Sequence, residues 1–163
     1  MPIKAVAFDV DGVLTDGGFW WGPDGQEWKR FCFADIMGLS LARKAGLLLA
    51  LISGEDSPLV DRLAGKMGIT DVYKNCKDKA QALRSFVESR QLNLKEVCFM
   101  GDDVNDLAAL DIAGLAAAPA DARPIVIEKC AYVAKANGGN GAAREVIDMI
   151  LAQTRAAGTA APR

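Results

Sequence analysis

Short apolar runs alternate with longer amphipathic stretches along most of this chain of 163 residues. The apolar runs predict β-strands at 3–9, 47–53, 71–74, 96–101, 114–118 and 131–134. The longer stretches have helical patterns at 36–45, 57–67, 77–91, 104–112, 121–128 and 141–155. Because strands that alternate with helices form parallel sheets with right-handed crossovers, we expect an α/β fold, a three-layer sandwich with a mostly parallel sheet.

One segment interrupts this alternation. Residues 17–33, "GGFWWGPDGQEWKRFCF", have β-prone flanks around a Pro-Asp-Gly turn, which predicts a protruding β-hairpin. Most aromatic residues of the chain lie in it: Phe19, Trp20, Trp21, Trp28, Phe31 and Phe33. Because a two-stranded ribbon is marginally stable alone and large apolar surfaces mark interfaces, we expect the hairpin to contact another subunit. The alternative is that it folds onto its own domain.

The length of the chain suits a single domain, which we expect to span residues 1–155. The segment 156–163, "AAGTAAPR", has little to bury and is expected to be a flexible tail. The net charge of −2 indicates no nucleic acid or membrane partner. No apolar run approaches the roughly 18 residues of a transmembrane helix, and "MPIKAVAFD" lacks the pattern of a signal peptide, so a cytoplasmic location is expected.

The cysteines and the lack of histidine restrict the possible chemistry. None of the four cysteines is paired at C-x-x-C spacing, which argues against a zinc site, and we expect buried, reduced thiols, with Cys98 in the core. The chain has no histidine, which excludes Ser-His and Cys-His nucleophilic sites. Acid–base chemistry near neutral pH must therefore come from carboxylates or lysines.

Polar residues gather where the predicted strands end. The first strand ends at Asp9, with Asp11 and Thr15 just after it, and the second ends at Ser53 and Gly54. Three lysines follow the third strand, at positions 74, 77 and 79, and "GDDVND" (101–106) follows the fourth. Because sites in open parallel sheets form at the carboxyl ends of the strands, we expect these groups to converge.

The combination of these groups indicates phosphoryl transfer. Converging carboxylates are costly unless a cation joins them, and Mg²⁺ is the usual hard cation beside a phosphate. A Ser-Gly turn before a helix offers a hydroxyl and backbone N–H groups to an anion, and a lysine adds positive charge. Each feature alone also has an ordinary structural explanation, as a solvated loop, a helix cap or a surface lysine. Together they favour metal-assisted phosphoryl transfer.

The same residues resemble a known superfamily. "FDVDGVLTDGG" resembles the first motif of the haloacid dehalogenase (HAD) superfamily, and "LISG", a lysine at a helix start and "GDDVND" resemble its other three. The resemblance implies a Rossmann-like fold, and the lack of a large insert after the first motif is typical of cap-less members. "TDGGFWWGPDGQEWKRF" and "GGNGAAREVI" (138–147) resemble the 3-deoxy-D-manno-octulosonate 8-phosphate (KDO 8-phosphate) phosphatases.

This resemblance implies a role for each motif residue. Asp9 would be the nucleophile that forms an aspartyl phosphate, and Asp11 the general acid and base. Mg²⁺ would be bound by the carboxylates of Asp9 and Asp102 and by the backbone carbonyl of Asp11. Ser53, Gly54 and Lys79 would hold the phosphate; the lysine at 79 is preferred to those at 74 and 77 because it opens the helix "KAQALRSFVESR". The residues expected to support these groups are Thr15, Asp103 and Asp106.

Three further residues bear on the substrate, which the resemblance implies is a phosphorylated 2-keto-3-deoxy sugar acid. Eight-carbon phosphatases typically have arginine after the Gly of the second motif, but this chain has Glu55. Nine-carbon relatives have glutamate there and a lysine eleven residues on, here Lys66, which can pair with the substrate carboxylate. This favours a nine-carbon KDN or N-acetylneuraminate 9-phosphate, with KDO 8-phosphate as the alternative. Arg144 is a candidate to meet an anionic group of the substrate, and all three residues can equally be exposed helix residues.

The resemblance also implies an assembly. Cap-less relatives form tetramers in which the hairpins pack together and a neighbour covers the active site, so a homotetramer is expected. Two other readings remain open: a catalytically idle oligomerisation module, and a phosphate-accepting signalling domain. The presence of both motif-one acids, the motif-two serine, the lysine and the motif-four acid favours an active enzyme.

Overall fold

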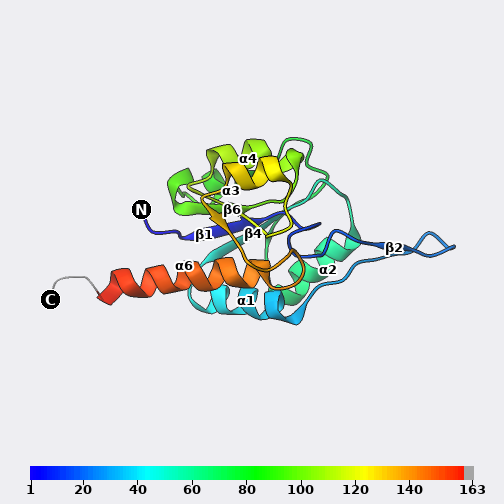
Figure 1. The fold of residues 1–163 in the computed structure, drawn as a ribbon, viewed down its shortest axis with the longest axis horizontal. Helices are drawn as coiled ribbons and strands as arrows, with labels where there is room; N and C mark the ends of the chain where they lie inside the picture. Colours follow the sequence, from blue (N-terminus) through cyan, green and yellow to red (C-terminus); the bar gives the residue numbers. More distant parts are fainter. Residues whose placement is uncertain (160–163) are drawn as a thin grey trace.

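The computed structural model describes residues 1–159 and contains a six-stranded sheet (Figure 1). Its strands, in the order in which they lie side by side, are β5 (Asp71–Tyr73), β4 (Leu48–Ile52), β1 (Ala5–Phe8), β6 (Val97–Met100), β7 (Leu115–Ala118) and β8 (Tyr132–Val133). Every pairing between neighbours is parallel, which confirms the expected sheet. The chain runs outward from β1 through β4 to β5 and then returns to β6, so the strand order reverses at β1.

Helices cover both faces of the sheet, which confirms the three layers (Figure 1). One layer contains α1 (Phe33–Lys44), α2 (Pro58–Met67) and α6 (Ala142–Thr159), and the other contains α3 (Lys79–Ser89), α4 (Leu107–Ile112) and α5 (Pro124–Lys129). Short 3₁₀ turns, η1 (Leu94–Glu96) and η2 (Val104–Asp106), precede β6 and α4. Alternate residues of β1 serve the two cores: Val6 and Phe8 pack against the first layer, and Ala5 and Ala7 against the second.

Local capping sets where two helices of the site begin. The Ser57 Oγ atom accepts a hydrogen bond from the Leu59 N–H at the start of α2, where Pro58 is the first helical residue. Asp78 caps α3 in the same way, by accepting a hydrogen bond from the Gln81 N–H at 3.0 Å. Lys79 is consequently the first residue of α3, at the carboxyl edge of the sheet.

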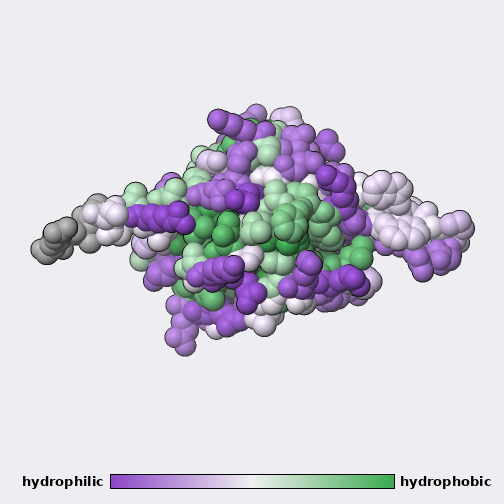
Figure 2. All heavy atoms as spheres, turned by 90° about the horizontal axis from the view of Figure 1, so that it is seen from below, coloured by the Kyte–Doolittle hydropathy of each residue, from purple (hydrophilic) through white to green (hydrophobic). Residues whose placement is uncertain are grey.

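The expected hairpin is present and protrudes from the body (Figures 1 and 2). Its antiparallel strands β2 (Trp20–Trp21) and β3 (Glu27–Trp28) place Trp20 opposite Trp28. The side chains of Phe19, Trp20, Trp21, Trp28 and Phe33 are exposed, whereas Phe31 packs against the core. Within the described chain the hairpin does not fold back to bury its tryptophans.

Two sequence expectations need correction. Helix α6 continues to Thr159, so the first half of the expected tail 156–163 is helical, while residues 160–163 lie outside the described residues. All four cysteines are free, but only Cys98 is buried; the other three are partly exposed. Within residues 1–159, no helix combines the length and the apolar character needed to cross a membrane.

Candidate active site

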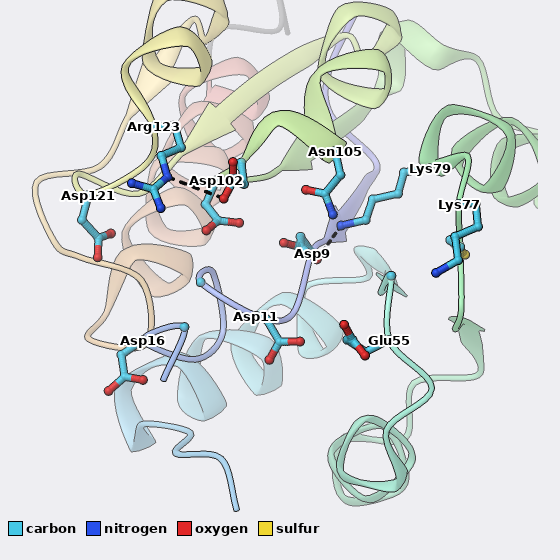
Figure 3. A pocket seen from close by; sticks show the side chains of 15 residues that line it. Asp9, Asp11, Asp16, Glu55, Lys77, Lys79, Asp102, Asn105, Asp121 and Arg123 are labelled. Atoms are coloured by element: carbon cyan, nitrogen blue, oxygen red, sulfur yellow. Dashed lines mark hydrogen bonds and ion pairs between the residues drawn. The ribbon is translucent and has the colours of Figure 1, made fainter. Parts of the chain in front are cut away.

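A cavity of about 700 Å³ opens at the carboxyl edge of the sheet, beside the point where the strand order reverses. Residues from the loops after β1, β4, β5, β6 and β7 line it: Asp9, Asp11, Gly12, Asp16, Gly17, Gly54, Glu55, Cys76, Lys77, Lys79, Asp102, Asp103, Asn105, Asp121 and Arg123 (Figure 3). The register pairs Phe8 with both Leu51 and Met100, so the residues that follow these three strands meet at one place. The predicted convergence of strand ends is therefore present.

Asp9 and Lys79 form the buried centre of the site. The Lys79 Nζ atom donates hydrogen bonds to Asp9 Oδ1 at 2.8 Å and to Asp106 Oδ1 at 2.7 Å, and all three side chains are buried. Burial alone lowers the pKa of Lys79, but the charges of Asp9 and Asp106 outweigh it and raise that pKa above its ordinary value. Lys79 therefore stays positively charged near neutral pH.

Asp106 connects the lysine to the loop after β6. While its Oδ1 atom accepts from Lys79, its Oδ2 atom accepts from the backbone N–H of Asp102 at 2.8 Å and of Asp103 at 3.2 Å. Both carboxylate oxygens of Asp106 are thus occupied by hydrogen bonds from neighbouring residues. Asp103 caps the η2 turn through Val104 and lies 3.6 Å from the Arg123 guanidinium at the rim.

The acids of the site fit a small divalent cation. Asp9, Asp102 and Asp106 offer carboxylate oxygens that lie within 4.8 Å of one another. Because Asp106 is engaged by Lys79 and two N–H groups, Asp9 and Asp102 are the carboxylates left to bind a metal. Burial raises the pKa of Asp9 well above its ordinary value, with Asp106 adding to the rise, and burial raises the pKa of Asp102 to about 6. A cation such as Mg²⁺ relieves both penalties.

Gly12 keeps space for Asp102. A Cβ atom on Gly12 would lie 1.9 Å from Asp102 Oδ2, and the residue has a φ of +87°, which side chains rarely adopt. The turn is closed by Thr15, whose Oγ1 atom accepts from the N–H groups of Gly12 at 3.3 Å and Gly17 at 3.1 Å. The loop after β1 is therefore shaped to bring Asp11 and Asp102 to the same cavity.

The residues expected to bind an anion lie on the side of the cavity formed by β4 and α3. Ser53 is buried, and its Oγ atom accepts a hydrogen bond from the Glu55 N–H at 3.2 Å. Gly54 lines the cavity, and a Cβ atom there would lie 4.0 Å from the Lys79 side chain. Glu55 also lines the cavity and lies on the same side as Lys77 and Lys79 (Figure 3).

Two of the three substrate candidates do not reach this cavity within the described chain. Lys66 lines a separate hollow on α2, together with Phe31, Phe33 and other residues. The Arg144 guanidinium binds Asp148 at 2.9 Å, one turn along α6. Of the three, only Glu55 lies in the cavity with Asp9.

The glycine-rich segment before α6 supports the loop after β1 of its own chain. The Gly139 N–H donates to the Val13 carbonyl at 3.0 Å, and the Gly138 N–H donates to Asp121 Oδ1 at 2.9 Å. A Cβ atom on Gly138 would lie 1.8 Å from the Gly12 carbonyl oxygen. The two loops are therefore in direct backbone contact.

Several residues of the site were not predicted from the sequence. Asp121 and Arg123 follow β7 in "PADARP", so the rule applied to the other strand ends would have identified them. Lys29 at the base of the hairpin donates to Asp11 Oδ1 at 2.8 Å and Oδ2 at 3.0 Å. No sequence signal identified Lys29, because the alternation pattern does not say where a hairpin lies relative to the sheet.

Comparison with known proteins bears on the chemistry of this cavity. Residues 52–146 match the haloacid dehalogenase-like hydrolase family. The chain is 36% identical over 149 residues to the 3-deoxy-D-manno-octulosonate 8-phosphate phosphatase KdsC of Escherichia coli K12, covering 91% of this chain and 79% of the relative.

Solved structures of similar proteins have the same fold. The 3-deoxy-D-manno-octulosonate 8-phosphate phosphatase from Moraxella catarrhalis, in complex with magnesium ion, phosphate ion and a KDO molecule, matches with a TM-score of 0.90 and 35% identity, over 92% of this chain and 86% of that one. The cobalt-bound phosphatase from Haemophilus influenzae matches with a TM-score of 0.89 and 35% identity, over 92% and 88% of the two chains.

Proposed function

The chain belongs to the haloacid dehalogenase-like hydrolases, and from this membership and the geometry of its cavity we propose that it hydrolyses the terminal phosphate of an eight-carbon 2-keto-3-deoxy sugar acid, KDO 8-phosphate. At the coarser level it is a phosphomonoester hydrolase of the sugar-acid phosphatase type, with Mg²⁺ as cofactor. The observation that carries the reaction is the buried contact of Lys79 with Asp9 beside Asp102.

The proposed substrate, KDO 8-phosphate, differs from the nine-carbon sugar acid that the sequence favoured. Glu55 and Lys66 favoured a nine-carbon sugar acid, but the 36% identical relative and the 35% identical structure that holds a KDO molecule support the eight-carbon substrate. The nine-carbon 9-phosphate remains the second candidate because Glu55 lines the cavity, where its carboxylate can accept hydrogen bonds from sugar hydroxyls.

The proposed reaction has two displacements. In the first, a carboxylate oxygen of Asp9 attacks the phosphorus, the bond from phosphorus to the sugar oxygen breaks, and Asp11 gives its proton to that oxygen. In the second, Asp11 takes a proton from water, the water oxygen attacks the phosphorus, and the bond to Asp9 breaks. The products are the sugar acid and inorganic phosphate, and both aspartates return to their starting states.

The remaining residues bind and stabilise charge. Lys79, the Ser53 hydroxyl and the backbone at Gly54 hold the phosphate oxygens through positive charge and hydrogen bonds. Mg²⁺, held by the carboxylates of Asp9 and Asp102 and the Asp11 carbonyl, supplies positive charge that offsets the charge of the phosphate. Thr15, Asp103 and Asp106 keep the loops after β1 and β6 in place.

The assembly we propose is a homotetramer in which the hairpins of different subunits pack together. This is supported by the exposed tryptophans, of which Trp21 is 73% exposed and Trp20 60% exposed. Contacts between subunits would also give Lys66 and Arg144 a route to a neighbour's cavity, which they do not reach in their own subunit. The four free cysteines suit the reducing cytoplasm, the location expected from the sequence.

The deciding experiment measures phosphate release with Mg²⁺ and compares kcat/KM for the eight-carbon 8-phosphate and the nine-carbon 9-phosphate. A preference of about tenfold, or about 1.4 kcal/mol in transition-state binding, for the eight-carbon substrate supports the proposal. The opposite preference, lost in Glu55→Gln, supports the nine-carbon candidate. Lack of activity on both substrates would overturn the sugar-acid assignment.

A further inference from the structure

Lys29 is a buried charge bound to the proposed acid–base residue. It follows β3 at the base of the hairpin, and only 4% of its side chain is exposed. Its Nζ atom donates to both carboxylate oxygens of Asp11, at 2.8 Å and 3.0 Å. Asp11 itself is one-third exposed and lines the cavity.

This ion pair is the main compensation for burying Lys29. A buried ammonium group is costly unless a carboxylate pairs with it. Among the described residues, the only other carboxylate within 4.0 Å of Lys29 Nζ is that of Glu27, at 3.8 Å. The position of the Lys29 side chain therefore depends on Asp11, and a contact to both oxygens restricts the rotation of the Asp11 carboxylate.

The backbone that carries Lys29 is also fixed to the site. Phe31 forms a β-bridge with Thr15, in the loop after β1. The Arg30 guanidinium donates to the Gly139 carbonyl at 3.0 Å, on the glycine-rich segment that packs against the same loop. The backbone next to Lys29 is thus held by two contacts, one to the loop after β1 and one to the glycine-rich segment.

We propose that Lys29 is a positioning residue for Asp11 in both of its protonation states. It binds both oxygens of the ionised carboxylate and the unprotonated oxygen of the acid form, and so holds Asp11 in the orientation needed for proton transfer. The hairpin is then part of the catalytic site of its own subunit. This inference rests on the proposed role of Asp11. A group that transfers a proton must lie within hydrogen-bond reach of its target, and a correctly placed one contributes about 10²- to 10⁴-fold to the rate. Loss of Lys29 leaves Asp11 in place but free to rotate.

The test compares Lys29→Met, Lys29→Arg, Asp11→Asn and the double variant K29M/D11N. The substrates are the sugar-acid phosphate and p-nitrophenyl phosphate, whose leaving group needs little protonation. We expect K29M to lower kcat about tenfold to 100-fold on the sugar-acid phosphate with little change in KM, and less on p-nitrophenyl phosphate. Lys29→Arg should recover part of the loss, and K29M should have no further effect once Asp11 is Asn.

A control is Lys129→Met, which removes a half-exposed lysine that pairs with Asp111 at 3.0 Å and does not line the cavity. Its kcat should equal that of the wild type. Thermal unfolding of each variant identifies any loss of kcat that comes from misfolding. Lys29→Arg keeps the positive charge and so remains informative if K29M is poorly folded.

The outcomes separate the two proposals. Full activity of D11N on both substrates would remove Asp11 from the acid–base role and with it the proposed mechanism. An impaired D11N beside a fully active K29M would overturn only the inference about Lys29. A rise in KM at constant kcat in K29M, or losses that multiply in the double variant, would also overturn it, because Lys29 would then act on the substrate or independently of Asp11.

Discussion

The Lys79 Nζ atom lies 2.8 Å from Asp9 Oδ1, although the two residues are 70 positions apart in the sequence. The same nitrogen lies 2.7 Å from Asp106 Oδ1, so one lysine compensates two buried carboxylates. This explains how the chain tolerates several acids at the end of a buried strand. Lys79 therefore contributes to the stability of the fold, in addition to its proposed role in phosphate binding.

The first prediction concerns this lysine. Lys79→Met leaves Asp9 and Asp106 buried without a cation, and breaking such a pair costs about 3–5 kcal/mol. We expect urea unfolding without Mg²⁺ to show a loss of this size near neutral pH, together with loss of phosphatase activity. Lys77→Met, at an exposed neighbour, should change the free energy of unfolding by less than about 0.5 kcal/mol. Equal stability of K79M and the wild type would contradict the interpretation.

The second prediction concerns pH and Asp102. Burial raises the pKa of Asp102 to about 6 in the folded protein, whereas an unfolded Asp has about 3.9. Between these values the folded state binds more protons than the unfolded state, so this group lowers stability as pH rises from about 4 to about 6. The metal-free wild type should lose about 1–2 kcal/mol more than Asp102→Asn across that window, after allowance for solvent screening. Unfolding at several pH values with EDTA measures the difference, and parallel curves for the two proteins would contradict it.

The third prediction concerns the metal. Because Asp9 and Asp102 are the carboxylates left to bind it, Mg²⁺ should stabilise the folded protein by about 2.7 kcal/mol at 100 times its Kd. We expect the melting temperature at pH 7.5 to rise with added Mg²⁺ in the wild type and to stay constant in Asp102→Asn. The same response in Lys129→Met as in the wild type is the control. A full Mg²⁺ response in D102N would place the metal elsewhere.

The fourth prediction concerns the hairpin. Trp20 and Trp28 face each other across its strands and are both exposed, so replacing them together with glutamate puts charge on the proposed subunit contact. Sedimentation equilibrium should report a tetramer for the wild type and smaller species for the double variant. Asp24→Ala, in the hairpin turn, should leave the mass unchanged. A monomeric wild type would overturn the tetramer.

The positions at which the strands of the site end were predictable, because each strand is an apolar run that stops at a polar residue. Each run marks a buried strand, and the polar residue after it must lie at the carboxyl edge, which located Asp9, Ser53 and Asp102. Lys79 was preferred to Lys77 because the family resemblance places a lysine at a helix start. The helix begins two residues later than the pattern 77–91 predicted, because Asp78 caps it and makes Lys79 its first residue.

Three features were not predictable from the sequence, each for a different physical reason. Lys29 meets Asp11 through a hairpin whose direction no local pattern sets. Arg144 has an acidic partner one turn away at Asp148, and this local pair competes with any distant anion. The helical residues 156–159 were assigned to a flexible tail because they bury little, although the alanines among them favour a helix.

The last prediction concerns the contact between the glycine-rich segment and the loop after β1. A Cβ atom on Gly138 would lie 1.8 Å from the Gly12 carbonyl oxygen, and backbone cannot move aside as a flexible side chain can. Gly138→Ala should therefore cost about 1–3 kcal/mol in unfolding free energy, as overpacked sites do, and lower kcat, because the displaced loop carries Asp11.

The matched control is Gly65→Ala within α2. A Cβ atom there meets no atom within 4 Å, and alanine favours a helix over glycine by about 1 kcal/mol, so this variant should be slightly more stable and fully active. Urea unfolding and phosphate release measured on both variants check the pair. If Gly138→Ala kept wild-type stability and kcat, the segment would not support the loop, and the close approach of the two backbones would have no role in placing Asp11.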